Sequence, residues 1–254
     1  MRLHRIEAGT GPALVILHGL MGAARNWAGM VQTLSEGRRV VALDLPNHGA
    51  SPWSETMDYP FLAAQVAEAI GDLGGRAAVL GHSMGGKAAM VLALTRPELV
   101  ERLVVADIAP VAYTHTFAPY VRAMRAVPLG QVSRRAEVEA QLAARIPDPR
   151  VRAFLMQNLE NGETGYRWRP NLAVLNAAMD DILAFPALRE ASRYEGPTLF
   201  LAGADSDYVL PDHLPQIHRL FPAARLESIP GAGHWLHADQ PAAFTAALRR
   251  FLAE

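Results

Sequence analysis

The stretch Gly81-His82-Ser83-Met84-Gly85 decides the fold that we predict for this chain. It follows an apolar run over residues 77–80 and precedes a helix-forming run over residues 87–94. The order of strand, Gly-x-Ser-x-Gly and helix is that of the nucleophile elbow, a turn so sharp that side chains two residues on either side of the serine would collide. Glycine, which lacks a Cβ atom, fits both of these places. We therefore predict that Ser83 stands at the carboxyl end of a strand as a nucleophile.

The same stretch also has the glycine spacing of a phosphate-binding loop, because Gly81, Gly86 and Lys87 match the first glycine, second glycine and lysine of that motif. In a phosphate-binding loop the next residue is a serine or threonine whose hydroxyl binds magnesium. Ala88 occupies that position, so the required hydroxyl is missing. We interpret Lys87, the only lysine of the chain, as a helix residue one turn after the nucleophile.

Composition limits the class of protein. The chain has 254 residues, half of them hydrophobic, which is enough for one substantial core with an insertion or for two domains. A net charge of -1 without a basic run gives no electrostatic footprint for nucleic acid or an anionic membrane, so small neutral or apolar substrates fit better. The absence of cysteine excludes disulfides and thiolate catalysis.

Residues 1–11 lack the apolar middle of a signal peptide, and no segment approaches the roughly 18 apolar residues of a membrane span. We expect a cytoplasmic protein, and the sequence does not predict its oligomeric state.

Short apolar runs alternate with helical stretches along most of the chain. The predicted strands cover residues 13–17, 40–45, 77–80, 103–108, 198–202 and 225–229, and the predicted helices cover residues 24–34, 61–73, 87–94 and 241–252. Continuous apolar runs are typical of strands buried on both faces, and strand-helix alternation is typical of parallel sheets with right-handed crossovers. The pattern predicts an α/β fold with a mostly parallel sheet flanked by helices.

The alternation stops over residues 112–186, where we expect only helices. Asp148 and Pro149 read as the start of one helix, with Val151 and Leu159 on a shared face, and Asn171 reads as the cap of another helix that ends near residue 185. We predict an α/β core over residues 1–111 and 187–254 and a helical cap over residues 112–186. The cap would lie over the carboxyl ends of the strands, where open α/β sheets bind ligands.

Aromatic and methionine side chains are frequent in the predicted cap. We expect some of them to line an acyl pocket and most of them to pack the cap's own core. The candidates are Tyr113, Phe117, Tyr120, Met124, Phe154, Met156 and Trp168.

A serine hydroxyl needs a base within hydrogen-bond reach and a carboxylate to orient that base. His234 is the predicted base, because it lies in the loop Gly231-Ala232-Gly233-His234-Trp235 between the last strand and the final helix. His237 completes a His-x-x-His pair, but no third ligand has metal spacing, so we predict no metal site. His82 cannot turn to serve its own neighbour, and His48 is expected to brace a loop.

A second turn faces the predicted nucleophile. His18-Gly19-Leu20-Met21 follows the strand over residues 13–17. We predict that the backbone N–H groups of Leu20 and Met84 form an oxyanion hole, the element that usually contributes most to the rate.

These motifs together resemble the α/β-hydrolase superfamily. The resemblance rests on His18-Gly19, on residues 44–51, 81–87 and 231–237, and on Asp107-Ile108-Ala109-Pro110, and it is weakest in the predicted cap. Within the superfamily the chain is most similar to a small esterase and thioesterase branch shared by bacteria and mitochondria. The resemblance implies a serine carboxylester hydrolase for short- to medium-chain acyl esters, with acyl thioesters as a further class, that uses an acyl-enzyme and no cofactor. Family membership does not fix the substrate.

The resemblance leaves the acid of the triad open. Most of the superfamily places it after the strand that follows the cap, near Asp205 and Asp207, although the usual offset falls on Ser206. The branch resembled here often places it after the preceding strand, at Asp107. Both strand ends would lie beside the elbow. We predict Asp107 and keep Asp207 and Asp205 as alternatives.

Two other functions remain open. The same fold and triad support C–C bond hydrolysis, lyase chemistry and perhydrolysis, which the sequence does not separate from ester hydrolysis. A non-enzymatic protein that binds a small apolar molecule under the cap is a third reading, and the intact set of Ser83, His234 and an aspartate argues against it.

Overall fold

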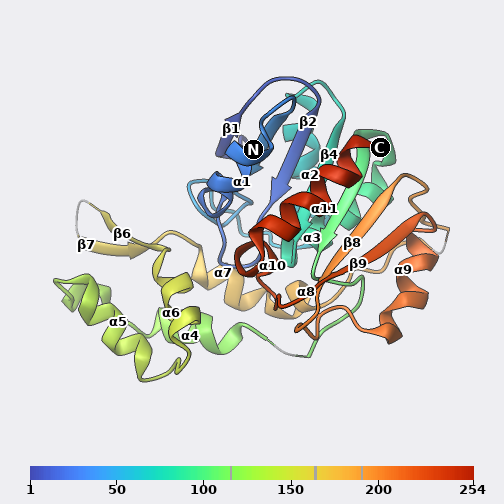
Figure 1. The fold of residues 1–254 in the computed structure, drawn as a ribbon. Helices are drawn as coiled ribbons and strands as arrows, with labels where there is room; N and C mark the ends of the chain where they lie inside the picture. The colour runs from blue at the N-terminus through green and yellow to red at the C-terminus, as the bar shows by residue number, and fades with distance from the viewer. Residues whose placement is uncertain (115, 163–164, 190) are drawn as a thin grey trace.

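The computed structural model describes residues 1–114, 116–162, 165–189 and 191–254, and its centre is a twisted sheet (Figure 1). Within these residues seven strands follow one another in the order β1-β3-β2-β4-β5-β8-β9. Their bounds are Arg5–Ala8 (β1), Ala13–Leu17 (β2), Arg39–Leu43 (β3), Ala77–His82 (β4), Val100–Ala106 (β5), Thr198–Gly203 (β8) and Ala224–Ile229 (β9). Only β1 pairs antiparallel among these described strands. The predicted α/β fold with a mostly parallel sheet is therefore confirmed.

Helices cover both faces of the sheet. Along β2, the side chains of Leu14 and Ile16 pack into one hydrophobic cluster, whereas those of Val15 and Leu17 pack into another. The first cluster includes α1 (Ala28–Leu34) and α11 (Pro241–Ala253), and the second includes α2 (Tyr59–Gly71), α3 (Met84–Thr95) and α9 (Leu214–Leu220). Because successive strand residues point to opposite faces, a strand between two helical layers is apolar at every position. This burial explains the continuous apolar runs of the sequence.

Short helical segments lie next to α1, α3, α9 and α11 in the chain. They are the 3-10 helices η1 (Ala24–Trp27), η2 (Pro97–Leu99) and η4 (Pro211–His213) and the helix α10 (Leu236–Asp239). The start of α2 is fixed by Asp58, whose carboxylate accepts a hydrogen bond from the Phe61 backbone N–H at 2.8 Å. Such a cap satisfies one of the backbone donors that every helix leaves free at its start.

The described part of residues 112–186 lies beyond the carboxyl ends of the strands, on the side to which the arrowheads of β2 and β8 point (Figure 1), and is termed the lobe. Its elements are α4 (Ala118–Arg125), η3 (Leu129–Gln131), α5 (Arg135–Ala143), α6 (Pro149–Met156), β6 (Leu159–Gly162), β7 (Gly165–Trp168), α7 (Leu172–Ala177) and α8 (Met179–Leu183). Residues 115 and 163–164 of the predicted cap range lie outside the described residues.

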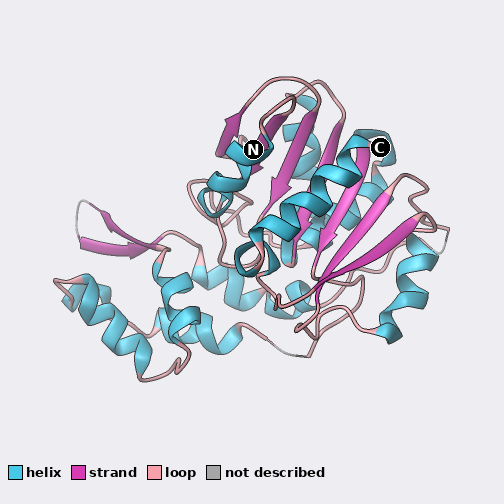
Figure 2. Ribbon diagram, viewed as in Figure 1, coloured by secondary structure: helices cyan, strands magenta, loops and turns pink. Residues whose placement is uncertain are grey.

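The expectation that this lobe holds only helices is wrong. β6 and β7 pair antiparallel (Figure 2), with Leu159 opposite Trp168 and Glu160 opposite Arg167. Helix α6 ends at Met156, so Leu159 does not lie on its apolar face. A second correction concerns the helix capped by Asn171, which is divided at Ala178 into α7 and α8. The Asn171 side chain accepts a hydrogen bond from Val174 N as expected of a cap.

No helix among the described residues is both long and apolar enough to cross a membrane.

Candidate active site

Ser83 lies on a strained turn between β4 and α3. Its backbone has φ 53° and ψ -120°, a conformation that a residue with a side chain rarely adopts. Two hydrogen bonds hold it, from Ser83 N to Ala106 O and from Lys87 N to Ser83 O, both 3.0 Å long. A methyl group on Gly81 would collide with the carbonyl of Gly85, and one on Gly85 would collide with the carbonyls of Leu17 and His18. The elbow therefore needs both glycines and presents the serine hydroxyl at the end of β4.

The three predicted triad residues lie next to one another. His234 Nε2 is 3.0 Å from Ser83 Oγ, and His234 Nδ1 is 2.8 Å from Asp107 Oδ2. These contacts join positions 151 and 127 residues apart in the chain. The Asp107 carboxylate accepts a hydrogen bond from Nδ1, so the neutral His234 imidazole carries its proton on Nδ1. Nε2 is then free to accept a proton from the serine.

Asp107 is fully buried and directly follows β5. Its backbone is left-handed with φ 51°, and its N–H donates to Leu201 O at 2.8 Å. The second carboxylate oxygen, Oδ1, accepts a hydrogen bond from Gly203 N at 2.9 Å. Because β5 and β8 are neighbours in the sheet, the backbone at the end of β8 fixes a carboxylate that comes from the end of β5.

The alternative acids lie elsewhere. Asp205 and Asp207 are exposed, and no hydrogen bond joins either carboxylate to His234 in the described part of the chain. Ser206, between them, donates its hydroxyl to Asp107 Oδ2. The structure thus brings Asp107 to the imidazole. At the position after β8 where most of the superfamily carries the acid, it places the hydroxyl of Ser206. The sequence pattern indicates this position but does not predict the role of the serine there.

A ring contact and a hydrogen bond to its backbone hold His234 in place. The ring of Tyr208 stacks on the imidazole with centroids 3.7 Å apart and an interplanar angle of 15°. His82 Nε2 lies 2.8 Å from the carbonyl oxygen of His234. Burial holds the pKa of His82 well below its ordinary value, so this ring is neutral and donates from Nε2. His82 consequently holds the backbone of His234 rather than exchanging a proton with Ser83.

The predicted oxyanion residues flank the serine. Met84 is the first residue of α3, and the first backbone N–H groups of a helix have no partner within the helix. Leu20 lies in a turn that is closed by a hydrogen bond from Gly22 N to Gly19 O at 2.9 Å. His18 supports this turn, because Nδ1 donates to Gly19 O at 2.8 Å while Nε2 accepts from Leu45 N at 3.0 Å. Burial lowers the pKa of His18, which keeps it in this neutral form.

A pocket opens above the serine and is enclosed by both the core and the lobe of residues 112–186. Its lining is mostly apolar and includes three of the predicted pocket residues, Tyr113, Phe117 and Phe154. Further apolar walls come from α8 and from the loop around His234. They are formed by Met179, Ile182, Leu183 and Trp235. The other predicted residues lie outside this lining. Met124, Met156 and Trp168 are buried in the lobe, and Tyr120 packs against Phe117.

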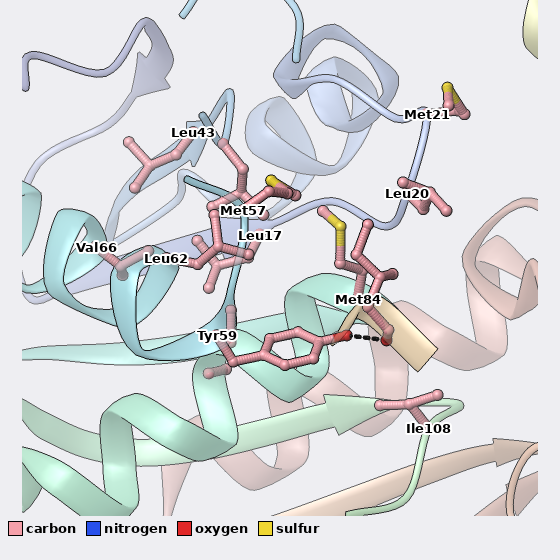
Figure 3. Packing of buried hydrophobic residues seen from close by; sticks show 14 of the residues in the cluster. Leu17, Leu20, Met21, Leu43, Met57, Tyr59, Leu62, Val66, Met84 and Ile108 are labelled. Atoms are coloured by element: carbon pink, nitrogen blue, oxygen red, sulfur yellow. Dashed lines mark hydrogen bonds between the residues drawn. The ribbon is translucent and has the colours of Figure 1, made fainter. Parts of the chain in front are cut away.

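Lys87 has a structural environment that no pattern in the sequence predicts. Lys87 is buried at the lining of the pocket, and its ammonium group donates to Leu183 O at 2.7 Å and to Ala184 O at 2.8 Å. The Tyr59 hydroxyl donates to the preceding carbonyl, Ile182 O, at 2.6 Å (dashed line in Figure 3). Desolvation lowers the pKa of Lys87 to about 7. Residues of α2 and α3 therefore hold the carboxyl end of α8, a wall of the pocket.

Comparisons with known proteins agree with this architecture. Residues 12–241 match the family described as alpha/beta hydrolase fold. The chain is 42% identical over 253 residues to a Danio rerio protein named sn-1-specific diacylglycerol lipase ABHD11, covering 96% of this chain and 79% of that protein. It is 32% identical over 241 residues to the Escherichia coli protein named Esterase YbfF, covering 94% and 92%. A solved structure named Marine microorganism esterase has a TM-score of 0.95 at 35% identity and covers 98% of both chains. The chain therefore belongs to the α/β-hydrolase superfamily and is an esterase-type serine hydrolase.

Proposed function

We propose that the protein hydrolyses carboxylic esters of short- to medium-chain acids through an acyl-enzyme on Ser83. The observation that carries this proposal is the unbroken chain of hydrogen bonds from Ser83 Oγ through the His234 imidazole to the Asp107 carboxylate. A hydroxyl near neutral pH is a weak nucleophile, and a base aligned at 3.0 Å removes its proton as it attacks.

In the first half of the reaction, Ser83 Oγ attacks the ester carbonyl while His234 Nε2 takes the hydroxyl proton. Asp107 stabilises the imidazolium that forms, and it keeps the ring in the required orientation. The N–H groups of Leu20 and Met84 donate to the oxyanion of the tetrahedral intermediate. His234 then returns the proton to the leaving alkoxide, and the alcohol departs. In the second half, water attacks the acyl-enzyme by the same steps and releases the acid and the free serine.

The pocket supports the proposed substrate class. Its apolar walls favour an acyl chain over a charged group, because a buried charge without a partner is costly. We propose that residues 112–186 act as a cap that supplies the outer walls of this pocket, including Phe154 and Met179. Relatives named as a diacylglycerol lipase and an esterase support ester substrates. Acyl thioesters are a further candidate class, since the same acyl-enzyme forms when a thiolate leaves.

The test is hydrolysis of p-nitrophenyl acetate, butyrate and hexanoate by the wild-type protein and by Ser83→Ala, together with matched acyl thioesters. We expect turnover of the esters by the wild type and a loss of at least about a thousandfold in kcat for the variant. Circular dichroism and thermal melting serve as folding controls for the variant. Equal turnover by both proteins would contradict the proposed nucleophile, and turnover of β-diketones in place of all esters would favour C–C bond hydrolysis.

A further inference from the structure

The segment that follows α6 contacts the loop that carries the proposed oxyanion donor Leu20. The side-chain amide of Asn158 donates from Nδ2 to Met21 O at 2.8 Å. Asn158 is 1% exposed, and 137 residues separate it from Met21. Its neighbour Gln157 strengthens the contact, because its backbone carbonyl accepts from Arg25 and its side-chain oxygen accepts from Asn26. The lobe of residues 112–186 thus meets the core directly beside the proposed catalytic centre.

The turn that Asn158 contacts is strained. The hydrogen bond from Gly22 N to Gly19 O makes residues 19–22 a β-turn, with Leu20 and Met21 in its centre. Met21 has φ 61°, the left-handed conformation that glycine or asparagine usually supplies at the third position of such a turn. Figure 3 shows Leu20 and Met21 side by side on this loop. A residue with a large side chain holds this conformation only where its surroundings fix it, at a cost of about 1–3 kcal/mol.

Asn158 supplies one of the contacts that fix it. The peptide group between Met21 and Gly22 is held at both ends, because its N–H donates to Gly19 O and its carbonyl accepts from Asn158 Nδ2. With this peptide plane fixed, the direction of the preceding N–H groups in the turn is restricted as well. Leu20 N–H is one of them.

We propose that Asn158 is a positioning residue that, from the lobe of residues 112–186, orients the Leu20 N–H toward the oxyanion. This inference rests on the proposed esterase function. An oxyanion donor acts on charge that develops only in the transition state. Loss of the Asn158 amide therefore lowers kcat and leaves KM nearly unchanged, whereas general damage to the pocket raises KM.

The experiment compares Asn158→Ala and Asn158→Asp with Asn171→Ala on p-nitrophenyl butyrate. Asn158→Asp keeps the shape of the side chain and removes the N–H donor, so it serves if Asn158→Ala does not fold. Asn171 is the matched control, because its Nδ2 also joins the lobe to the core, at 3.2 Å to Asn47 Oδ1, and neither of these two residues lines the pocket. A second readout is inhibition by an alkyl boronic acid, whose tetrahedral adduct resembles the intermediate.

We expect both Asn158 variants to lose about 10-fold to 100-fold in kcat, with KM within twofold of wild type and inhibition by the boronic acid weakened by a similar factor. Asn171→Ala should keep wild-type kcat. An unchanged kcat in the Asn158 variants, or an equal loss of kcat in Asn171→Ala, overturns the inference. If the wild type hydrolyses no ester, the proposed function fails, and the rate of fluorophosphonate labelling then decides on Asn158, because this reaction needs the oxyanion donors whatever the natural substrate is.

Discussion

The Ser206 hydroxyl lies 2.5 Å from Asp107 Oδ2, the same carboxylate oxygen that His234 Nδ1 contacts at 2.8 Å. Ser206 follows β8, whereas Asp107 follows β5, and the two strands are paired in the sheet. Two neighbouring strand ends therefore contribute to one acid site. The other carboxylate oxygen, Oδ1, accepts a hydrogen bond from Gly203 N. The Asp107 carboxylate thus accepts one hydrogen bond from Ser206 and one from Gly203, which fix its plane facing the imidazole.

Removal of the Ser206 hydroxyl should weaken this site without abolishing it. We predict that Ser206→Ala lowers kcat on p-nitrophenyl butyrate by about tenfold, the equivalent of one hydrogen bond of ~1.4 kcal/mol to a charged group. Steady-state kinetics at pH 8 measure the effect. A kcat equal to that of the wild type would show that Asp107 needs no support from this hydroxyl.

The acid itself can be identified by three matched variants. We predict that Asp107→Asn lowers kcat by about 10⁴-fold, because an amide that donates toward Nδ1 selects the wrong tautomer of His234. Asp205→Asn and Asp207→Asn remove exposed carboxylates from the same face and should retain most of the activity. The three kcat values are compared at one pH after thermal melting has shown that each variant is folded. A large loss in Asp207→Asn or Asp205→Asn, with Asp107→Asn active, would assign the acid differently.

The sequence was sufficient for the parts of this fold that have a strong local signal. The strand predicted over residues 13–17 is β2, because five consecutive apolar residues suit only a strand covered on both faces. The sequence does not predict the edge strand β1, since Arg5–Ala8 is short and half-polar. The sequence does not predict the pair β6 and β7 for a similar reason, although a glycine, Gly162 or Gly165, stands at the adjoining end of each strand.

The residues of the candidate site also differ in how well the sequence predicts them. Ser83 was predictable because the elbow dictates glycines at fixed positions, and His234 because of its glycine-rich loop. The choice between Asp107 and Asp207 was not decided by the residues alone, since both follow strands whose ends converge on the elbow. Contacts such as that of Asn158 with Met21 O leave no local pattern, because they arise only when distant segments pack.

The Lys87 contacts predict a change in selectivity. In Lys87→Met, Leu183 O and Ala184 O lose their buried donor, so the end of α8 is no longer held against α3. Ile182 and Leu183 line the pocket, and we therefore predict that kcat/KM for p-nitrophenyl hexanoate falls about tenfold relative to that for acetate. The ratio of the two kcat/KM values is the measurement. An equal fall for both esters would indicate a general loss of folded protein instead.

Buried histidines predict acid sensitivity of the fold. Burial lowers the pKa of His48 from 6.5 to about 3 and that of His237 from 6.5 to about 4. Between these values and 6.5 the unfolded chain binds protons that the folded chain does not bind. Stability is therefore complete above pH 6.5 and is lost as the pH falls, by at most ~1.4 kcal/mol per pH unit for each such group.

Urea denaturation at pH 7 and pH 5 measures this effect. The free energy of unfolding of the wild type should fall between the two values. It should fall less in His48→Asn, which removes a group that is 0% exposed and titrates in this range only when unfolded. An equal fall in the two proteins would assign the acid sensitivity to other groups.

The central claim is that His234 activates Ser83 as a nucleophile, and labelling with a fluorophosphonate tests it most directly. The reagent reacts with activated serines, and peptide mapping by mass spectrometry identifies the modified residue. We predict one adduct on Ser83 in the wild type, none in Ser83→Ala, and labelling at least about a hundredfold slower in His234→Ala. An adduct on a different residue, or equal labelling rates in the wild type and His234→Ala, would contradict the account.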